Sequence, residues 1–177
     1  MEKFFNTAGP NKPDIHYEIA PLSRFDLDEV LMLIRQQKYF VLHAPRQTGK
    51  TTCMLALRNY LNEQGDYMAV YANVEGGQAA RENVQSVVAG ICDTIARQTA
   101  SIFEDERVKS VRDIVRDNDS SSMLSSFLAQ LSRVLPRPLV LILDEIDSLV
   151  GDSLISVLRQ IRSGPKWPRR VAGPMWC

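Results

Sequence analysis

The strongest indication of how this chain folds is the stretch Tyr39-Phe-Val-Leu-His-Ala-Pro-Arg-Gln-Thr-Gly-Lys-Thr-Thr52. It opens with the apolar run Tyr39–Leu42, and from Lys50 onward its residues begin a helical segment. The octapeptide Ala44–Thr51 lies between the two. A strand, a loop that ends in Gly-Lys-Thr, and a helix follow one another in this order in a phosphate-binding loop, or P-loop.

Each residue at the end of this loop has a physical role in holding phosphate. Backbone N–H groups of such a loop point inward, and the following helix adds about half a positive charge at its N-terminus. Gly49 lets the backbone wrap closely round an anion, and Lys50 supplies a positive charge for the β- and γ-phosphates. Thr51 supplies a hydroxyl oxygen for Mg²⁺, a cation that prefers oxygen ligands.

The loop departs from the usual pattern at its first position, where Ala44 stands in place of glycine. Because alanine is the smallest change available, we expect the loop to bind nucleotide. The alternative is a Gly-Lys-Thr turn that lies by coincidence between a strand and a helix. Arg46 could reach the γ-phosphate or stay solvated, and His43 is expected to pack at the strand end. The predicted nucleotide-binding residues are Ala44, Pro45, Arg46, Gln47, Thr48, Gly49, Lys50, Thr51 and Thr52.

A second motif lies far along the chain. The continuous apolar run Leu139–Leu143 is typical of a strand buried on both faces, and it ends in Asp144 and Glu145. In a P-loop protein the strand-end Asp holds Mg²⁺, and a neighbouring Glu can polarise the attacking water. The alternative, an acid favoured by the dipole of the next helix, suits Asp147 better. The predicted metal ligands are Thr51 and Asp144, and the predicted catalytic residues are Glu145 and Lys50.

Composition indicates a globular domain with no bias toward a charged partner. The 177 residues are 45% hydrophobic and 24% charged, and Lys plus Arg equals Asp plus Glu at 21 each. The cysteines Cys53, Cys92 and Cys177 share no metal-ligand or redox spacing, which fits a reducing compartment. Residues Met1–Asn11 lack the apolar core of a signal peptide, and no run has the length of a membrane span. We therefore expect a cytoplasmic protein that contacts no membrane.

The order of elements predicts an α/β fold. Residues 1–25 are expected to be irregular, and residues 26–162 to form the core, with a helix capped by Asp26 and Glu29. A helix over Lys50–Gln64, stopped by Gly65, precedes a strand over Tyr67–Asn73. Because strands then alternate with helices, we predict three layers, with helices on both faces of a mainly parallel sheet.

These phrases, Tyr39–Thr52 and Leu-Ile-Leu-Asp-Glu-Ile-Asp147, resemble those of bacterial AAA-like ATP-binding proteins. Such proteins belong to the P-loop ATPases that include the AAA+ and STAND classes. The Asp-Glu-Ile-Asp phrase is also similar to that of origin-recognition-type initiator ATPases. The resemblance covers about Phe4 to Arg162, and its motifs are specific for the superfamily rather than for a pathway.

The resemblance implies further roles. It implies ATP rather than GTP; the one Asn-Lys-x-Asp phrase in the chain, Asn11-Lys-Pro-Asp14, comes before the phosphate-binding loop and is not interpreted as a guanine-reading phrase. It implies that Asp144 assists Mg²⁺ and that Glu145 is the catalytic base. Asn73 could hold that Glu in an inactive pose, or it could simply be a turn residue at a strand end. The segment Ile19–Arg24 is expected to contribute to an adenine pocket.

The C-terminal residues 163–177 depart from the family. With Pro165, Pro168 and Pro174, they are expected to form an irregular basic tail, although Val171-Ala172 could supply a short surrogate strand. In the family, the strand that carries a polar sensor residue lies here, between the phosphate-loop strand and the acidic strand. We therefore expect a truncated core with a gap at the middle of its sheet.

Three hypotheses of function follow. The first is Mg²⁺-dependent hydrolysis of ATP. No arginine finger is identifiable, so it could come from a neighbouring subunit or be missing with the C-terminus. A second copy of the chain or a partner protein could therefore associate with the domain. The second is a nucleotide-binding module or inactive fragment without turnover. The third is a DNA-associated initiator-like ATPase, suggested by the basic tail, although the net charge of zero gives nucleic-acid binding no support.

Overall fold

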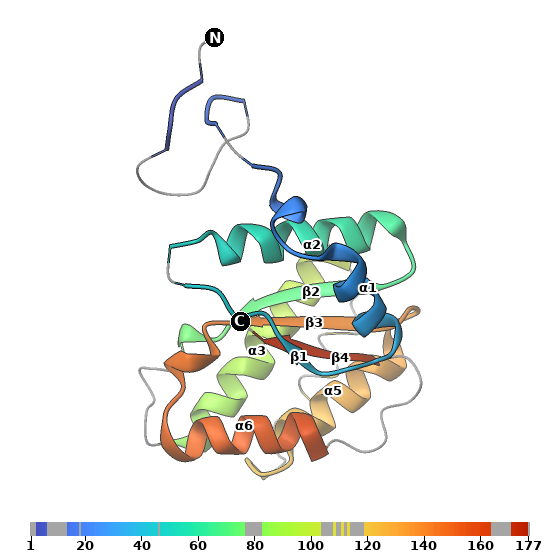
Figure 1. The fold of residues 1–177 in the computed structure, drawn as a ribbon. Coiled ribbons are helices and arrows are strands. Elements are labelled where there is room, and N and C mark those ends of the chain that lie inside the picture. The colour runs from blue at the N-terminus through green and yellow to red at the C-terminus, as the bar shows by residue number, and fades with distance from the viewer. Residues whose placement is uncertain are drawn as a thin grey trace.

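The computed structural model describes residues 3–6, 14–17, 19–45, 47–76, 83–103, 108, 111, 113, 119–163 and 171–176. They form an α/β fold with a parallel sheet, as predicted (Figure 1). The elements in chain order are η1 (Pro21–Arg24), α1 (Leu27–Arg35), β1 (Phe40–Val41), α2 (Lys50–Gln64), β2 (Met68–Asn73), α3 (Val84–Phe103), α5 (Met123–Val134), β3 (Leu139–Asp144), η3 (Ile146–Ser148), α6 (Gly151–Ser163) and β4 (Val171–Trp176).

The sheet has the order β1-β4-β3-β2, and all its neighbouring strands are parallel. Helices α1 and α2 cover one face, while α3, α5 and α6 cover the other (Figure 1). Every residue of β3 is buried, which explains why Leu139–Leu143 is a continuous apolar run rather than an alternating one. Because the strands are parallel, their carboxyl ends lie at one edge of the sheet.

The register of β2 on β3 decides which side chains face α2. Ala69 pairs with Val140 and Tyr71 pairs with Ile142, and Ala69, Val140 and Ile142 belong to the core beneath α2. The residues between them, such as Leu141, lie in the larger core beneath α3, α5 and α6. Since side chains alternate between faces along a strand, Asp144 falls on the α2 face.

Local signals in the sequence set the helix ends. The side chain of Asp26 accepts a hydrogen bond of 2.9 Å from the N–H of Glu29, which confirms the predicted N-cap of α1. Helix α2 spans Lys50–Gln64, as predicted, and ends at Gly65 with a φ of 81°. No helix in the described part of the chain has the length and apolar character needed to cross a membrane.

The expectation of an irregular tail is wrong for residues 171–176. They form β4, which pairs with β1 on one side and with β3 on the other. The predicted gap at the middle of the sheet is therefore filled, and by more than the short Val171-Ala172 pair. The physical reason is that the inner edges of β1 and β3 would otherwise leave backbone N–H and C=O groups unpaired.

A bulge accommodates the proline that argued against this strand. Ala172 pairs with Val140 and Met175 pairs with Ile142, so Gly173 and Pro174 together lie opposite one residue of β3. At such a bulge the ladder is locally interrupted, and a residue without an N–H is tolerated. Pro165 and Pro168 lie outside the described residues, as do the other residues of the predicted tail up to position 170.

We predict that removal of residues 171–177 abolishes cooperative unfolding. Each backbone group left unpaired at the middle of the sheet costs about 1–3 kcal/mol, against a total stability of about 5–15 kcal/mol for a typical domain. Urea denaturation followed by far-ultraviolet circular dichroism measures this, with a chain lacking only Cys177 as the control. A wild-type midpoint and slope in the shortened chain would contradict the role of β4.

Cys92 gives the core a pH-dependent signature. Burial raises the pKa of its thiol from 9.0 to about 12, and the carboxylate of Asp93 acts in the same direction. The thiol ionises in the unfolded chain above about pH 9 but stays protonated in the folded one. We therefore expect the free energy of unfolding to fall as the pH rises from 9 toward 12. Urea titrations across this range test this, and Cys92→Ala should flatten the fall.

Candidate phosphate-binding site

The loop between β1 and α2 folds back on itself. The hydroxyl of Thr48 donates to the carbonyl oxygen of Pro45 at 2.7 Å. Gln47 and Gly49 both have left-handed backbones, with φ of 61° and 77°. Glycine adopts this conformation without strain, so Gly49 lets the chain turn directly into the first residue of α2, Lys50. Arg46 lies outside the described residues.

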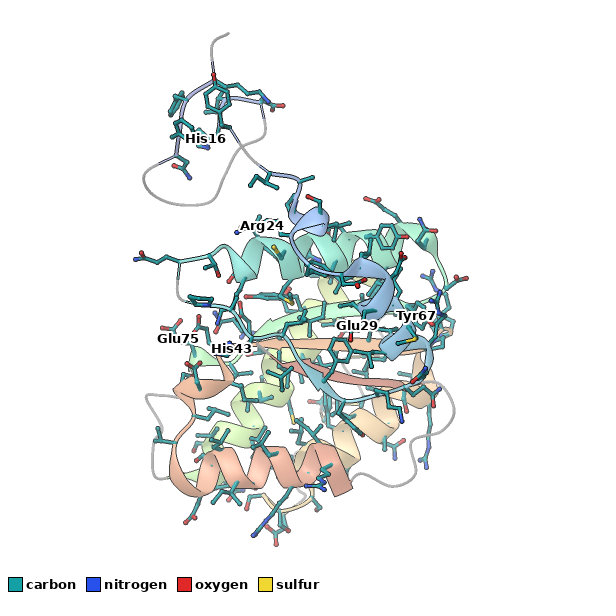
Figure 2. The ribbon with its side chains drawn as sticks, viewed as in Figure 1. His16, Arg24, Glu29, His43, Tyr67 and Glu75 are labelled. Carbon is teal, nitrogen blue, oxygen red and sulfur yellow. The ribbon has the colours of Figure 1, made fainter. Side chains whose placement is uncertain are left out.

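Arg24 braces the loop from outside. Its guanidinium Nη2 donates a hydrogen bond to the carbonyl oxygen of Thr48. A Cβ added at Gly49 would lie 2.7 Å from Nη1 of the same guanidinium, so the absence of a side chain at Gly49 makes room for Arg24. Arg24 ends η1 and extends toward the α2 side of the sheet (Figure 2).

Asp144 joins the loop to the acidic strand. The hydroxyl of Thr51 donates to its Oδ2 at 2.8 Å across 93 residues of sequence. The hydroxyl of Tyr71 donates to the same oxygen at 2.7 Å, and the N–H of Glu145 donates to Oδ1 at 3.0 Å. Only 1% of Asp144 is exposed, so these donors replace the water that burial removes.

A cavity of about 500 Å³ opens beside this network. It brings together the loop, the residues after β2 and the residues after β3, and its described lining residues include one cationic side chain and three carboxylates. Figure 2 shows Glu75, from the end of β2, at the edge of the sheet where the strands end. The residues that line the cavity are Gln47, Gly49, Lys50, Thr51, Glu75, Glu145 and Asp147.

A smaller cavity of about 210 Å³ lies on the other side of the loop. Lys50 lines both cavities, and Arg24 lines the smaller one. The contribution of Ile19–Arg24 to an adenine pocket stays a prediction. His43 is exposed and lines the smaller cavity as well, rather than packing into the core. The lining residues of this cavity are Arg24, Phe25, Leu42, His43, Ala44, Thr48, Lys50, Cys53 and Met54.

The predicted site residues thus fall into two groups. Gln47, Gly49, Thr51 and Glu145 line the larger cavity, and Ala44 and Thr48 line the smaller one. Pro45 contributes the carbonyl that accepts from Thr48, and Thr52 follows in the first turn of α2.

Asn73 forms the strand-end turn that was one of its two predicted roles. Its side-chain oxygen accepts a hydrogen bond of 2.8 Å from the N–H of Glu75, which is an Asx turn. Its register partner on β3 is Asp144, so it stands beside the acidic pair. The role of a switch that restrains Glu145 stays a prediction.

Sequence reasoning missed Tyr71 and Glu75. A signal existed for Tyr71, because it lies two residues before Asn73 on β2 and so shares a face with the end of that strand. A signal also existed for Glu75, because an Asn side chain often accepts a hydrogen bond from the backbone N–H two residues later, and Glu75 lies two residues after Asn73. Neither signal shows how the two strands align, and the alignment is what brings Tyr71 to Asp144.

The oxygen donors present fit magnesium. Among the described residues, no group of three or more His, Cys, Asp and Glu side chains is arranged to hold a metal ion. Mg²⁺ needs no such cage, because it keeps several waters and is bound through one or two carboxylates together with phosphate oxygens. The Thr51 hydroxyl and the buried Asp144 carboxylate are oxygen groups that would suit such a partial shell.

Fold and site together define an α/β domain with a Gly-Lys-Thr loop at the carboxyl edge of a parallel sheet. The chain belongs to the family described as nephrocystin 3, N-terminal, whose model matches residues 27–172. The match runs from the start of α1 into β4, so it includes the C-terminal strand. No curated protein matches the chain.

We predict that Gly49→Ala destabilises the protein. A left-handed backbone costs a residue with a side chain about 1–2 kcal/mol, and the new Cβ would also displace Arg24. Gly90 is the matched control, because a Cβ there meets nothing within 4 Å and the residue lies in α3. Gly90→Ala should stabilise by up to about 1 kcal/mol. Equal urea midpoints for the two variants would show that the loop geometry is wrong.

Proposed function

We propose that this chain is an ATP-binding domain of the AAA-like P-loop class that hydrolyses ATP with Mg²⁺. The observation that carries the proposal is the 2.8 Å hydrogen bond between Thr51 and Asp144. It joins two motifs that are distant in sequence, each of which has a role in phosphate chemistry. If the Gly-Lys-Thr sequence were only a coincidental turn, there would be no reason to expect its threonine to contact the acidic strand.

The roles of the residues follow from their positions. Lys50 lines both cavities, where its charge would neutralise the β- and γ-phosphates. Thr51 and Asp144 would hold Mg²⁺, which when bound neutralises charge that develops on the phosphate oxygens. Glu145 lines the larger cavity one residue beyond Asp144, where it would orient the attacking water.

Binding without turnover is the second candidate function. Around the larger cavity, the described lining residues include three carboxylates, Glu75, Glu145 and Asp147, and one cation, Lys50. Hydrolysis develops negative charge that a second cation usually stabilises. An arginine from a second copy of the chain or from a partner protein would supply it, and without one the domain would bind ATP and retain it.

The cysteines support a cytoplasmic setting. Cys53 and Cys92 are free thiols and both are buried. Unpaired buried thiols persist in a reducing compartment. This agrees with a substrate, ATP, that is abundant there.

We expect Mg·ATP to stabilise the protein and Lys50→Ala to remove that effect. A ligand at one hundred times its dissociation constant raises the free energy of unfolding by about 2.7 kcal/mol. Thermal unfolding with ATP, with GTP and without nucleotide measures this. Glu63→Gln, an exposed change on α2 away from the loop, should respond as the wild type does. Equal stabilisation of wild type and Lys50→Ala would rule out nucleotide binding by this loop.

Glu145→Gln separates the two candidate functions. If the chain hydrolyses ATP, this change should lower the steady-state rate by about 10²- to 10⁴-fold, the usual contribution of a general base. Stabilisation by Mg·ATP should persist, because the phosphate-binding residues are unchanged. Phosphate release assays on the wild type decide first: ATP binding with no release of phosphate favours the module without turnover.

A further inference from the structure

Tyr71 is a hydrogen-bond partner of the buried Asp144, and no sequence motif predicts this contact. It lies on β2, opposite Ile142 of β3, and Asp144 is the next residue of β3 on the same face. Its ring packs against the apolar core beneath α2, which restricts its position. Its hydroxyl donates to Asp144 Oδ2 at 2.7 Å. A residue of the neighbouring strand β2 therefore holds Asp144, in addition to Thr51 of α2.

The hydrogen bonds distinguish the two oxygens of Asp144. A carboxylate oxygen has about two acceptor positions. Oδ2 accepts from both hydroxyls, those of Thr51 and Tyr71, while Oδ1 accepts from the N–H of Glu145. Within this network Oδ2 is filled, and Oδ1 retains one position. The hydroxyl of Thr51 donates a hydrogen bond to Asp144, so the lone pairs of the Thr51 oxygen stay available for a cation.

We propose that Tyr71 is a positioning residue for magnesium. By filling Oδ2 it would fix the rotation of the Asp144 carboxylate, so that Oδ1 would keep an acceptor position for a hydrated cation. Without the hydroxyl, each oxygen has an open position and the carboxylate can rotate away from Thr51. Tyr71 acts through Asp144 and does not touch the nucleotide. This inference rests on the proposed function, since it assigns the magnesium of the same site.

Tyr71→Phe tests the proposal, because it removes one oxygen and keeps the ring. Binding of a fluorescent ATP analogue is measured in EDTA and across a titration of Mg²⁺. In EDTA the affinity should match wild type, because the loop is intact. The Mg²⁺ concentration that gives half of the added affinity should rise about three- to tenfold, the equivalent of one hydrogen bond.

Tyr67→Phe is the matched control. Tyr67 precedes β2 at the far end of the sheet and packs against the same core (Figure 2). It should leave the Mg²⁺ dependence unchanged. A merely structural role for Tyr71 would instead lower affinity equally with and without Mg²⁺, because a loosened core weakens the whole site.

A double-mutant cycle and a measurement on the intact protein guard against misfolding of Tyr71→Phe. With Asp144→Asn already present, Tyr71→Phe should change the Mg²⁺ dependence no further, because the carboxylate it positions is gone. With 3-fluorotyrosine in place of the five tyrosines, the Tyr71 fluorine resonance should shift with Mg·ATP but not with ATP in EDTA. Single Tyr→Phe changes at the other four positions assign it.

The outcomes separate this proposal from the proposed function. Suppose that Lys50→Ala abolishes ATP binding, that Tyr71→Phe keeps the Mg²⁺ dependence of the wild type, and that the Tyr71 fluorine resonance does not shift with Mg·ATP. The proposed function then stands, and the role of Tyr71 is overturned. If wild type binds no ATP under any condition, the proposed function fails and the inference fails with it. A selective loss of Mg²⁺ response in Tyr71→Phe supports both.

Discussion

The structure depends on a buried carboxylate that is held from three directions. Asp144 ends a fully buried strand, and burial of a charge is tolerated only where donors replace water. One donor is the Thr51 hydroxyl of α2, one is the Tyr71 hydroxyl of β2 and one is the backbone N–H of the next residue, Glu145. The relative placement of loop, helix and sheet is thereby fixed at the edge where a phosphate would bind, and a change in any of these elements reaches the site through Asp144.

The central strand β4 helps to fix the distance between the loop and Asp144. Strand β4 lies between β1, which leads into the loop, and β3, which leads into Asp144. Because both strands use β4 for their inner hydrogen bonds, the separation between the loop and the acid is set by one intervening strand. Gly173 and Pro174 are accommodated in a bulge, so the ladder resumes at Met175 and continues to the carboxyl edge.

Much of this could be predicted from the sequence where the determinants are local. Asp26, Gly65 and the apolar run of β3 set their elements through nearest neighbours. The alignment of strands is not local, and neither the contact of Tyr71 with Asp144 nor that of Arg24 with Thr48 has a signature in its own segment. Strand β4 could be predicted only as a possible short pair, Val171-Ala172, for a related reason. Pro174 cannot donate a backbone hydrogen bond and so disfavours a strand locally, whereas the hydrogen bonds of β4 to both β1 and β3 favour one.

If the loop and the acidic strand form one site for Mg·ATP, as proposed, the two segments should respond to the nucleotide together. Hydrogen–deuterium exchange with a non-hydrolysable ATP analogue and Mg²⁺ tests it on the intact chain. We expect slower exchange in the peptides that cover residues 44–52 and in those that cover residues 139–145, with both effects lost in Lys50→Ala. Unchanged exchange in both segments at saturating analogue, or protection of one segment without the other, would contradict it.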